Sequence, residues 1–181
     1  MLERDDTMYQ KVDALSEEEV TKYKVHMPLE EQVVMALQQQ NKTICCAESC
    51  TGGLLSATLI NVAGASDVLM EGYVTYSNEA KHRLLQVSEE TLQKKGAVSY
   101  DTAAQMAYGA AQAAHASVAC ATTGIAGPGG GTKEKPVGLV YIGIYICGTT
   151  YVAQCHFSGD RQTVRKKAVE QAFSLLLQRL G

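Results

Sequence analysis

Residues 43–53, TICCAESCTGG, place a serine and two glycines directly after a short apolar run. The run from Thr43 to Ala47 has the length and apolar character of a buried strand, and a helix is expected from Gly52 to Asn61. A serine at such a strand-to-helix turn exposes its hydroxyl, and the first N–H groups of the helix can stabilise an anion beside it. The same pattern also fits a plain helix cap, so this segment alone leaves both interpretations open.

Strand and helix patterns alternate on both sides of this segment. The predicted strands are 43–47, 68–76, 118–123, 139–147 and 151–157, and the predicted helices are 28–41, 52–61, 77–85, 88–95, 99–114 and 160–180. A tight turn at Gly148-Thr149 joins the last two strands as a hairpin. Helices that separate buried strands, followed by a hairpin, predict an α/β fold, a three-layer α/β/α sandwich with a mixed sheet.

The composition is that of one globular domain, with 46% hydrophobic and 19% charged residues among 181. The net charge of -3 argues against a general nucleic-acid surface but permits a local anion pocket. We expect neither a secretory signal nor a membrane span, because no apolar leader and no long apolar stretch is present. Most of the six cysteines lie in apolar runs without a C-x-x-C pair, as expected of reduced thiols in a cytoplasmic protein.

The start of the chain differs from the rest. Residues 1–28 form a polar extension, in which Ser16 and the three glutamates after it predict the start of a helix. The main domain is expected over residues 29–181. We interpret the extension as peripheral, either helical or an oligomer contact.

A serine nucleophile needs a base, and Lys81 is the best candidate. The chain has no G-x-S-x-G motif, and its four histidines form no recognisable triad pattern. With Ser77 as N-cap, Lys81 falls at the end of the first helical turn, where the helix dipole and burial would both lower the pKa of its ammonium group. Tyr76, at the end of the preceding strand, could hydrogen-bond Ser49 or Lys81. A solvated lysine and a packed tyrosine remain the alternatives.

Two further segments could bind phosphate. Residues 122–131, TTGIAGPGGG, resemble a phosphate-cradling loop, although they lack the G-K-[ST] order of a Walker A motif and would also suit a flexible connection. Arg161 follows Gly159-Asp160 at a helix start, where N–H donors and a guanidinium can bind one phosphate together. Arg165 and Lys166, one turn further along, are expected on the solvent-exposed face.

Several motifs in a fixed order resemble one family. They are AESCTGG at 47–53, GYVTYSNEAK at 72–81, GAVS at 96–99, TGIAGPGG at 123–130, KPVG at 135–138 and GDR at 159–161. From residue 29 to its end the chain is similar to the CinA C-terminal domain family, the nicotinamide mononucleotide amidohydrolases, as a stand-alone form. The resemblance implies hydrolysis of nicotinamide mononucleotide to nicotinic acid mononucleotide and ammonia in pyridine-nucleotide recycling, by a serine–lysine mechanism without metal or cofactor.

The resemblance also implies roles for individual residues. Ser49 matches the nucleophile, Lys81 the base and Tyr76 an assisting phenol. The expected oxyanion donors are the backbone N–H groups of Cys50, Gly52 and Gly53. The residues expected near the substrate are Asn78, Thr123, Gly124, Gly127 and Arg161.

Three other functions remain open at this point. The chain could be a nucleotide-binding or regulatory domain of the competence/damage-inducible type, without turnover. It could be an amidase that uses Cys50 as its nucleophile, or a scaffold in DNA uptake or repair, which the net charge does not support. The expected partner is a small pyridine nucleotide, not a nucleic acid or a membrane, and we expect a homo-oligomer.

Overall fold

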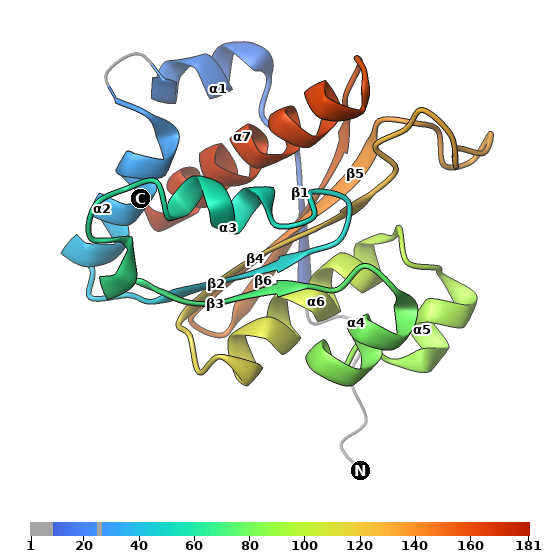
Figure 1. The fold of residues 1–181 in the computed structure, drawn as a ribbon, viewed down its shortest axis with the longest axis horizontal. Helices are drawn as coiled ribbons and strands as arrows, with labels where there is room; N and C mark the ends of the chain where they lie inside the picture. Colours follow the sequence, from blue (N-terminus) through green and yellow to red (C-terminus); the bar gives the residue numbers. More distant parts are fainter. Residues whose placement is uncertain (1–8, 25–26) are drawn as a thin grey trace.

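In the part of the chain that the structure describes, residues 9–24 and 27–181, a mixed six-stranded sheet forms the centre of the computed structural model (Figure 1). The strands are β1 (Tyr9–Val12), β2 (Ile44–Glu48), β3 (Leu69–Val74), β4 (Val118–Gly124), β5 (Leu139–Ile146) and β6 (Thr149–His156). Their order across the sheet is β1-β6-β5-β4-β2-β3. Strand β5 runs antiparallel to both of its neighbours, and the other pairs are parallel. The carboxyl-terminal ends of β2, β3, β4 and β6 therefore lie at the same end of the sheet.

Helices cover both faces of this sheet. One face carries α1 (Glu17–Lys24), α2 (Leu29–Gln39), α3 (Leu54–Leu59) and α7 (Arg161–Leu180), and the other carries α4 (Asn78–Leu85), α5 (Glu89–Lys94) and α6 (Tyr100–Ala113) (Figure 1). A short 3-10 helix, η1 (Ala65–Asp67), precedes β3. Apolar side chains of α2, α3 and α7 pack on one side of the central strands, and those of α6 pack on the other. The predicted α/β fold with a mixed sheet between helical layers is confirmed.

Polar caps fix where α4, α5, α6 and α7 begin. Ser77, Ser88, Ser99 and Asp160 each accept a hydrogen bond from the backbone N–H three residues later. This bond satisfies one of the free donors that open every helix. The helix starts predicted at these positions are confirmed.

The hairpin turn between β5 and β6 is placed wrongly by the sequence. Thr149 already pairs with Ile146 in the ladder, so the turn consists of Cys147 and Gly148. Both turn residues have positive φ angles, of 43° and 102°. Two-residue hairpin loops of this left-handed kind match the twist of the strands, and a cysteine gives no sequence signal for one.

The polar extension contributes to the same sheet. Ser16 and Glu19 form a reciprocal capping box that opens α1, as predicted for this helix start. Helix α1 packs on α7, where Lys24 forms an ion pair of 2.8 Å with Glu170. Strand β1, which the sequence did not predict, pairs in parallel with β6 and adds a sixth strand at the edge of the sheet.

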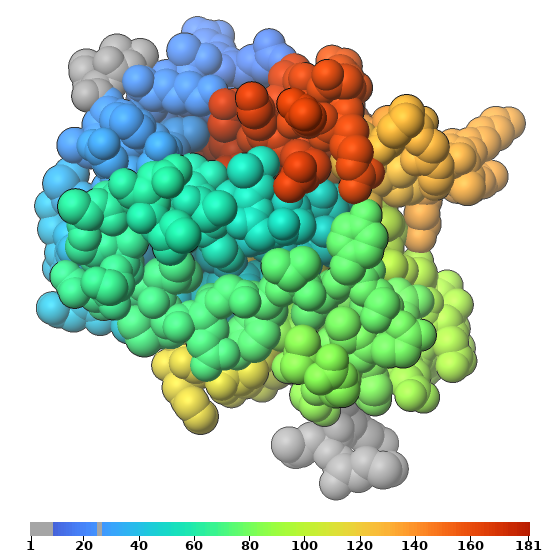
Figure 2. Space-filling model, in the orientation of Figure 1, coloured from blue at the N-terminus to red at the C-terminus, as the bar shows by residue number. Residues whose placement is uncertain are grey.

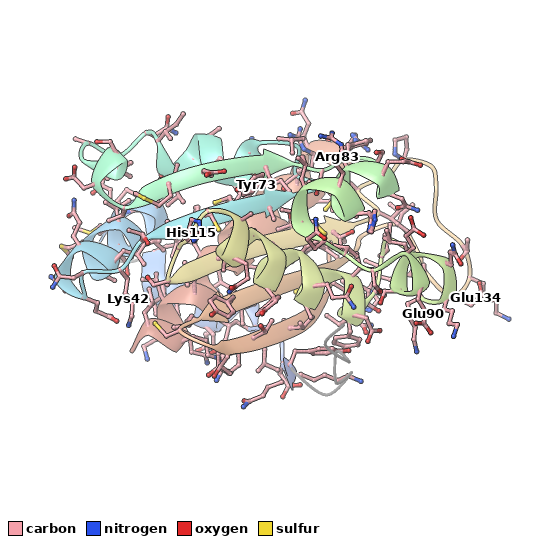
Figure 3. The ribbon with its side chains drawn as sticks, turned by 90° about the horizontal axis from the view of Figure 1, so that it is seen from below. Lys42, Tyr73, Arg83, Glu90, His115 and Glu134 are labelled. Carbon is pink, nitrogen blue, oxygen red and sulfur yellow. The ribbon has the colours of Figure 1, made fainter. Side chains whose placement is uncertain are left out.

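Different segments lie at the two ends of the strands. Lys42 and His115, which precede β2 and β4, lie toward one end of the molecule, whereas Arg83 and Glu134 lie toward the other (Figure 3). The loop between β4 and β5, which contains Glu134, projects from that second end (Figure 2). In open α/β sheets, ligands bind at the carboxyl ends of the parallel strands. A ligand site is therefore expected at the end of the sheet where β2, β3, β4 and β6 end.

Small residues allow α6 to lie very close to its neighbours. A Cβ atom added at Gly109 would lie 1.8 Å from the backbone oxygen of Leu85 in α4. One added at Gly143 in β5 would lie 2.3 Å from the backbone oxygen of Ala103 in α6. Helix α6 therefore packs closely on both α4 and the sheet.

This close approach makes Gly109→Ala destabilising. Alanine favours a helix over glycine by roughly 1 kcal/mol, but here its methyl group meets backbone that cannot rotate away, and overpacking of this kind costs about 1 to 3 kcal/mol or more. We expect a net loss of unfolding free energy in urea titrations followed by circular dichroism. Gly129→Ala is the control, because nothing lies within 4 Å of its added Cβ. A Gly109→Ala protein as stable as the wild type would contradict the packing described.

Candidate active site

Ser49 and Lys81 meet at the carboxyl ends of β2 and β3. Nζ of Lys81 lies 3.0 Å from Oγ of Ser49 and donates a second hydrogen bond of 2.7 Å to the backbone carbonyl of Thr75. The lysine is 1% exposed, whereas Ser49 is half-buried. Burial lowers the pKa of Lys81 from 10.5 to about 8. A useful fraction of the amine is therefore neutral near pH 8 and able to accept a proton from Ser49.

A buried carboxylate holds the turn that follows β2. Glu48 has no exposed surface, and its Oε2 accepts hydrogen bonds from the Thr51 hydroxyl (2.7 Å) and from the N–H groups of Gly53 (3.0 Å) and Leu55 (2.9 Å). Its Oε1 accepts from the N–H (2.9 Å) and the hydroxyl (2.7 Å) of Ser56. Charge-assisted bonds at a helix N-terminus are favourable, because the helix dipole also attracts an anion there. The carboxylate thus fixes the start of α3.

Neighbouring strands fix the backbone on either side of the serine. The N–H of Ser49 donates to the carbonyl of Thr122 in β4 at 2.9 Å, and the N–H of Thr75 donates to the carbonyl of Glu48 at 2.8 Å. The hydroxyls of Thr51 and Thr122 lie 2.6 Å apart and share a hydrogen bond. Ser49 therefore follows the end of β2 and lies between the ends of its two parallel neighbours, β3 and β4.

The turn itself departs from the sequence prediction in one respect. Gly52 and Gly53 have φ angles of 58° and 94°, so α3 begins at Leu54 and not at Gly52. Glycine adopts this left-handed region without the penalty of a Cβ atom. The N–H of Gly53, expected as an oxyanion donor, is instead bound to Glu48. Among the described residues, the N–H groups of Cys50 and Gly52 have no protein acceptor.

A second group of predicted residues gathers around Arg161. Its Nη1 donates to the carbonyl of Gly127 at 2.8 Å, and its Nη2 donates to the hydroxyl of Tyr76 at 3.1 Å. Tyr76 is 64% exposed, and within the described residues its hydroxyl is hydrogen-bonded to Arg161 and not to Ser49 or Lys81, the two partners expected from the sequence. The guanidinium thus connects the start of α7 with the loop after β4 and with the end of β3.

The remaining predicted residues have different environments. Thr123 is fully buried, and its hydroxyl donates to the carbonyl of Ala97 at 2.7 Å, so it joins β4 to the segment before α6. Gly124 ends β4 where a Cβ atom would lie 2.6 Å from the backbone oxygen of Leu139. Asn78 is exposed at the first turn of α4 and lines a cavity of about 530 Å³ between α4 and α5.

Cys50 is poorly suited to act as a nucleophile. It is 6% exposed, and burial raises the pKa of its thiol to about 12. The thiolate is the reactive form of cysteine, so this thiol is almost entirely unreactive at neutral pH. The environment of Cys50 therefore disfavours the cysteine amidase.

Two residues of this region escaped the sequence analysis. Arg165 does not lie on the solvent face as expected, because its Nε and Nη2 donate to the carbonyl of Thr51 at 3.1 and 2.6 Å. The signal available was its spacing of four from Arg161, which places both guanidinium groups on one face of α7. For Glu48 the signal was its position as an acidic residue at the end of an otherwise apolar strand, because a carboxylate buried there needs hydrogen-bond donors.

The described residues form neither a metal-binding cluster nor a membrane-spanning helix. Within residues 9–24 and 27–181, no three His, Cys, Asp or Glu side chains gather as they would around a metal ion. Over the same residues, no helix combines the length and the apolar character needed to cross a membrane. All six cysteines are free thiols, and Cys147 alone of them is exposed.

Comparison with known proteins gives one family. The sequence model of the CinA C-terminal domain matches residues 26–180. A competence-damage inducible protein of Clostridium botulinum is 51% identical over 152 residues, which are 84% of this chain and 37% of that protein. Its counterpart in Clostridium acetobutylicum is 56% identical over 141 residues, 78% of this chain and 34% of that protein. The chain thus spans about a third of the length of these curated relatives.

Solved structures share the fold over nearly their whole length. The competence/damage inducible protein CihA from Agrobacterium tumefaciens has a TM-score of 0.81 at 38% identity, covering 91% of this chain and 98% of that one. A CinA superfamily protein from Escherichia coli has a TM-score of 0.81 at 33% identity, covering 98% and 99%. These two solved structures therefore share the overall fold of this chain.

Replacing the buried carboxylate with an amide tests the description of the turn. Glu48→Gln keeps the shape but points an NH₂ group at hydrogen-bond donors, so we expect a loss of about 3 kcal/mol or more in the free energy of unfolding. Urea titration would measure it. Glu134→Gln, in an exposed loop, is the matched control and should change stability little. Equal stabilities for the two variants would show that the Glu48 network does not hold the turn.

Proposed function

Because the chain belongs to the CinA C-terminal domain family, we propose that it is a serine amidohydrolase that converts nicotinamide mononucleotide to nicotinic acid mononucleotide and ammonia. The observation that carries the proposal is the 3.0 Å contact between Oγ of Ser49 and the buried amine of Lys81. A lysine with a lowered pKa beside a half-exposed serine suits an activated nucleophile. The substrate is taken from the resemblance of the motifs at 47–53, 72–81 and 123–130 to that family.

The first half of the reaction acylates the serine. The neutral amine of Lys81 accepts the hydroxyl proton as Oγ of Ser49 attacks the carboxamide carbon. The resulting oxyanion needs donors, and the N–H groups of Cys50 and Gly52 have no protein acceptor among the described residues. The ammonium of Lys81 then returns the proton to the departing nitrogen, the C–N bond breaks, and ammonia leaves an acyl-serine ester.

The second half releases the acid. Neutral Lys81 takes a proton from water as the water oxygen attacks the ester carbon, and the same donors hold the second oxyanion. The proton passes back to Oγ as the ester bond breaks, which restores Ser49 and frees the nicotinic acid nucleotide. One lysine thus acts as base and as acid in each half.

Arg161 supports a substrate that carries a phosphate. Its guanidinium is exposed at the N-terminus of α7, beside the glycine-rich loop, and five N–H donors leave capacity beyond its bonds to Gly127 and Tyr76. A phosphate bound there would position the distant carboxamide against Ser49. Such remote binding energy lowers the barrier by orienting the reacting groups.

Loss of the nucleophile is the direct test of this function. Purified protein would be incubated with nicotinamide mononucleotide, and the products separated by chromatography alongside an ammonia assay. Ser49→Ala should lower kcat by at least about 10³-fold with little change in substrate binding, because the hydroxyl acts in the transition state. If wild-type protein releases no nicotinic acid mononucleotide, or if Ser49→Ala keeps a tenth of its kcat, the proposal fails.

The pKa of Lys81 predicts how activity depends on pH. The kcat/KM profile should rise through an apparent pKa near 8, because the base must lose its proton before it can act. Lys81→Arg should be inactive at every pH tested, since a guanidinium does not deprotonate. An active Lys81→Arg variant would remove Lys81 from the mechanism.

The same shift predicts how stability depends on pH. The folded pKa of about 8 lies below the ordinary 10.5, so the unfolded chain binds this proton more tightly. The site therefore destabilises the fold by roughly 3 kcal/mol below pH 8, and this penalty disappears as pH rises from 8 to about 10.5. Lys81→Met keeps the bulk without the charge, so it should be at least as stable as the wild type at pH 7. Thermal unfolding of both proteins at several pH values would measure the gap, which should close on the alkaline side.

A further inference from the structure

Arg165 directs its charge at a backbone carbonyl and not at a carboxylate. Nε and Nη2 both donate to the oxygen of Thr51, at 3.1 and 2.6 Å, and the N–H of Leu54 donates to the same oxygen at 3.2 Å. The ion pairs formed among the described residues do not include Arg165. Its partner lies 114 positions away in the sequence, in the turn that carries Ser49.

The carbonyl of Thr51 and the N–H of Gly52 belong to one peptide group. A trans peptide is planar, so its C=O and N–H point in opposite directions, and fixing the oxygen fixes the direction of the N–H. Gly52 reaches this position with a φ of 58°, and a Cβ atom there would lie 3.8 Å from Nη2 of Arg165. The guanidinium therefore lies directly against this peptide.

Several of the N–H groups that follow Gly52 already have acceptors. Glu48 accepts from Gly53, Leu55 and Ser56, which leaves the Gly52 N–H without a protein acceptor among the residues described. A cation bound to a carbonyl oxygen draws electrons toward that oxygen and makes the N–H of the same peptide a stronger donor. Two opposite charges thus hold the turn. The carboxylate of Glu48 accepts hydrogen bonds from N–H groups of the turn, and the guanidinium of Arg165 donates to the carbonyl of Thr51.

We propose that Arg165 is a positioning residue for amide hydrolysis, which orients and polarises the Thr51–Gly52 peptide so that the N–H of Gly52 meets the oxyanion formed at Ser49. This inference rests on the proposed function, because it assigns a donor to the intermediate of that reaction. Arg165 itself touches neither the substrate nor the reacting atoms. Its effect on catalysis passes through the peptide that it holds.

Two substitutions separate the parts of this role. Arg165→Met keeps much of the bulk and removes the charge and both donors, whereas Arg165→Lys keeps the charge without the planar pair of donors. Lys166→Met, at the adjacent exposed position, is the matched control for loss of a positive charge on α7. Each protein would be assayed well below its own unfolding temperature, so that only folded enzyme contributes.

The measurements are kcat and KM for nicotinamide mononucleotide, with the pH profile of kcat/KM. Arg165→Met should lower kcat by about 10- to 100-fold, somewhat less than the loss of a whole oxyanion donor. KM should change by less than about threefold, and the apparent pKa near 8 should stay in place, because Lys81 is untouched. Arg165→Lys should fall between, and Lys166→Met should match the wild type. If Arg165→Met lowers only the unfolding temperature and leaves kcat intact, Arg165 is a structural contact and the proposal is wrong.

A second probe separates this proposal from the choice of substrate. Acetyl transfer from p-nitrophenyl acetate to Ser49 passes through an oxyanion but needs no pyridine nucleotide, and Ser49→Ala gives the background rate. If the wild type acylates with this ester but leaves nicotinamide mononucleotide unchanged, the substrate is wrong, and a slower Arg165→Met reaction would still support the role of Arg165. An equal rate for the two proteins would overturn that role. A wild type inert to both compounds would end both proposals.

Discussion

Five donors converge on the carboxylate of Glu48, which has no contact with solvent. A carboxylate buried without partners would be strongly unfavourable, so the chain after β2 must supply donors at once. It does so by turning through two left-handed glycines and presenting the first N–H groups of α3 to the oxygens. The same turn leaves Ser49 at its outer side, beside Lys81. The position of the serine thus follows from the need to satisfy one buried charge.

The parallel strands bring the remaining parts to this turn. Strands β2, β3, β4 and β6 all end on the same side of the sheet. The segments that follow these strands therefore meet there, although they are far apart in the sequence. The segment after β3 supplies the carbonyl of Thr75 and the helix that carries Lys81. The segment after β6 leads into α7, whose first two turns carry Arg161 and Arg165. Ser49, Lys81 and the two arginines therefore come from the segments that follow three different strands of one sheet.

Much of this arrangement could be predicted from local sequence, and the errors have a common cause. The serine caps, the buried strands and the small residues of α6 each carry a local signal, because a cap, an apolar run or a glycine acts within a few residues. Strand β1 carries no such signal: its four residues become a strand only by pairing with β6, far along the chain. Arg165 was misplaced for the same reason, since its partner lies in another part of the sequence. The pairing of Ser49 with Lys81 was suggested by the motifs, but its geometry depends on long-range contacts.

The geometry around Lys81 serves both of its protonation states. As an ammonium it donates to the carbonyl of Thr75 and to Oγ of Ser49, at 2.7 and 3.0 Å. As a neutral amine it keeps a proton for the carbonyl and turns its lone pair toward the serine, so the heavy atoms need not move when the proton is transferred. A site that needs no rearrangement between the two states lowers the barrier to transfer, which is the advantage of a preorganised environment. Burial that makes the ammonium unfavourable and contacts that suit either form thus both support the proposed role of Lys81 as a base.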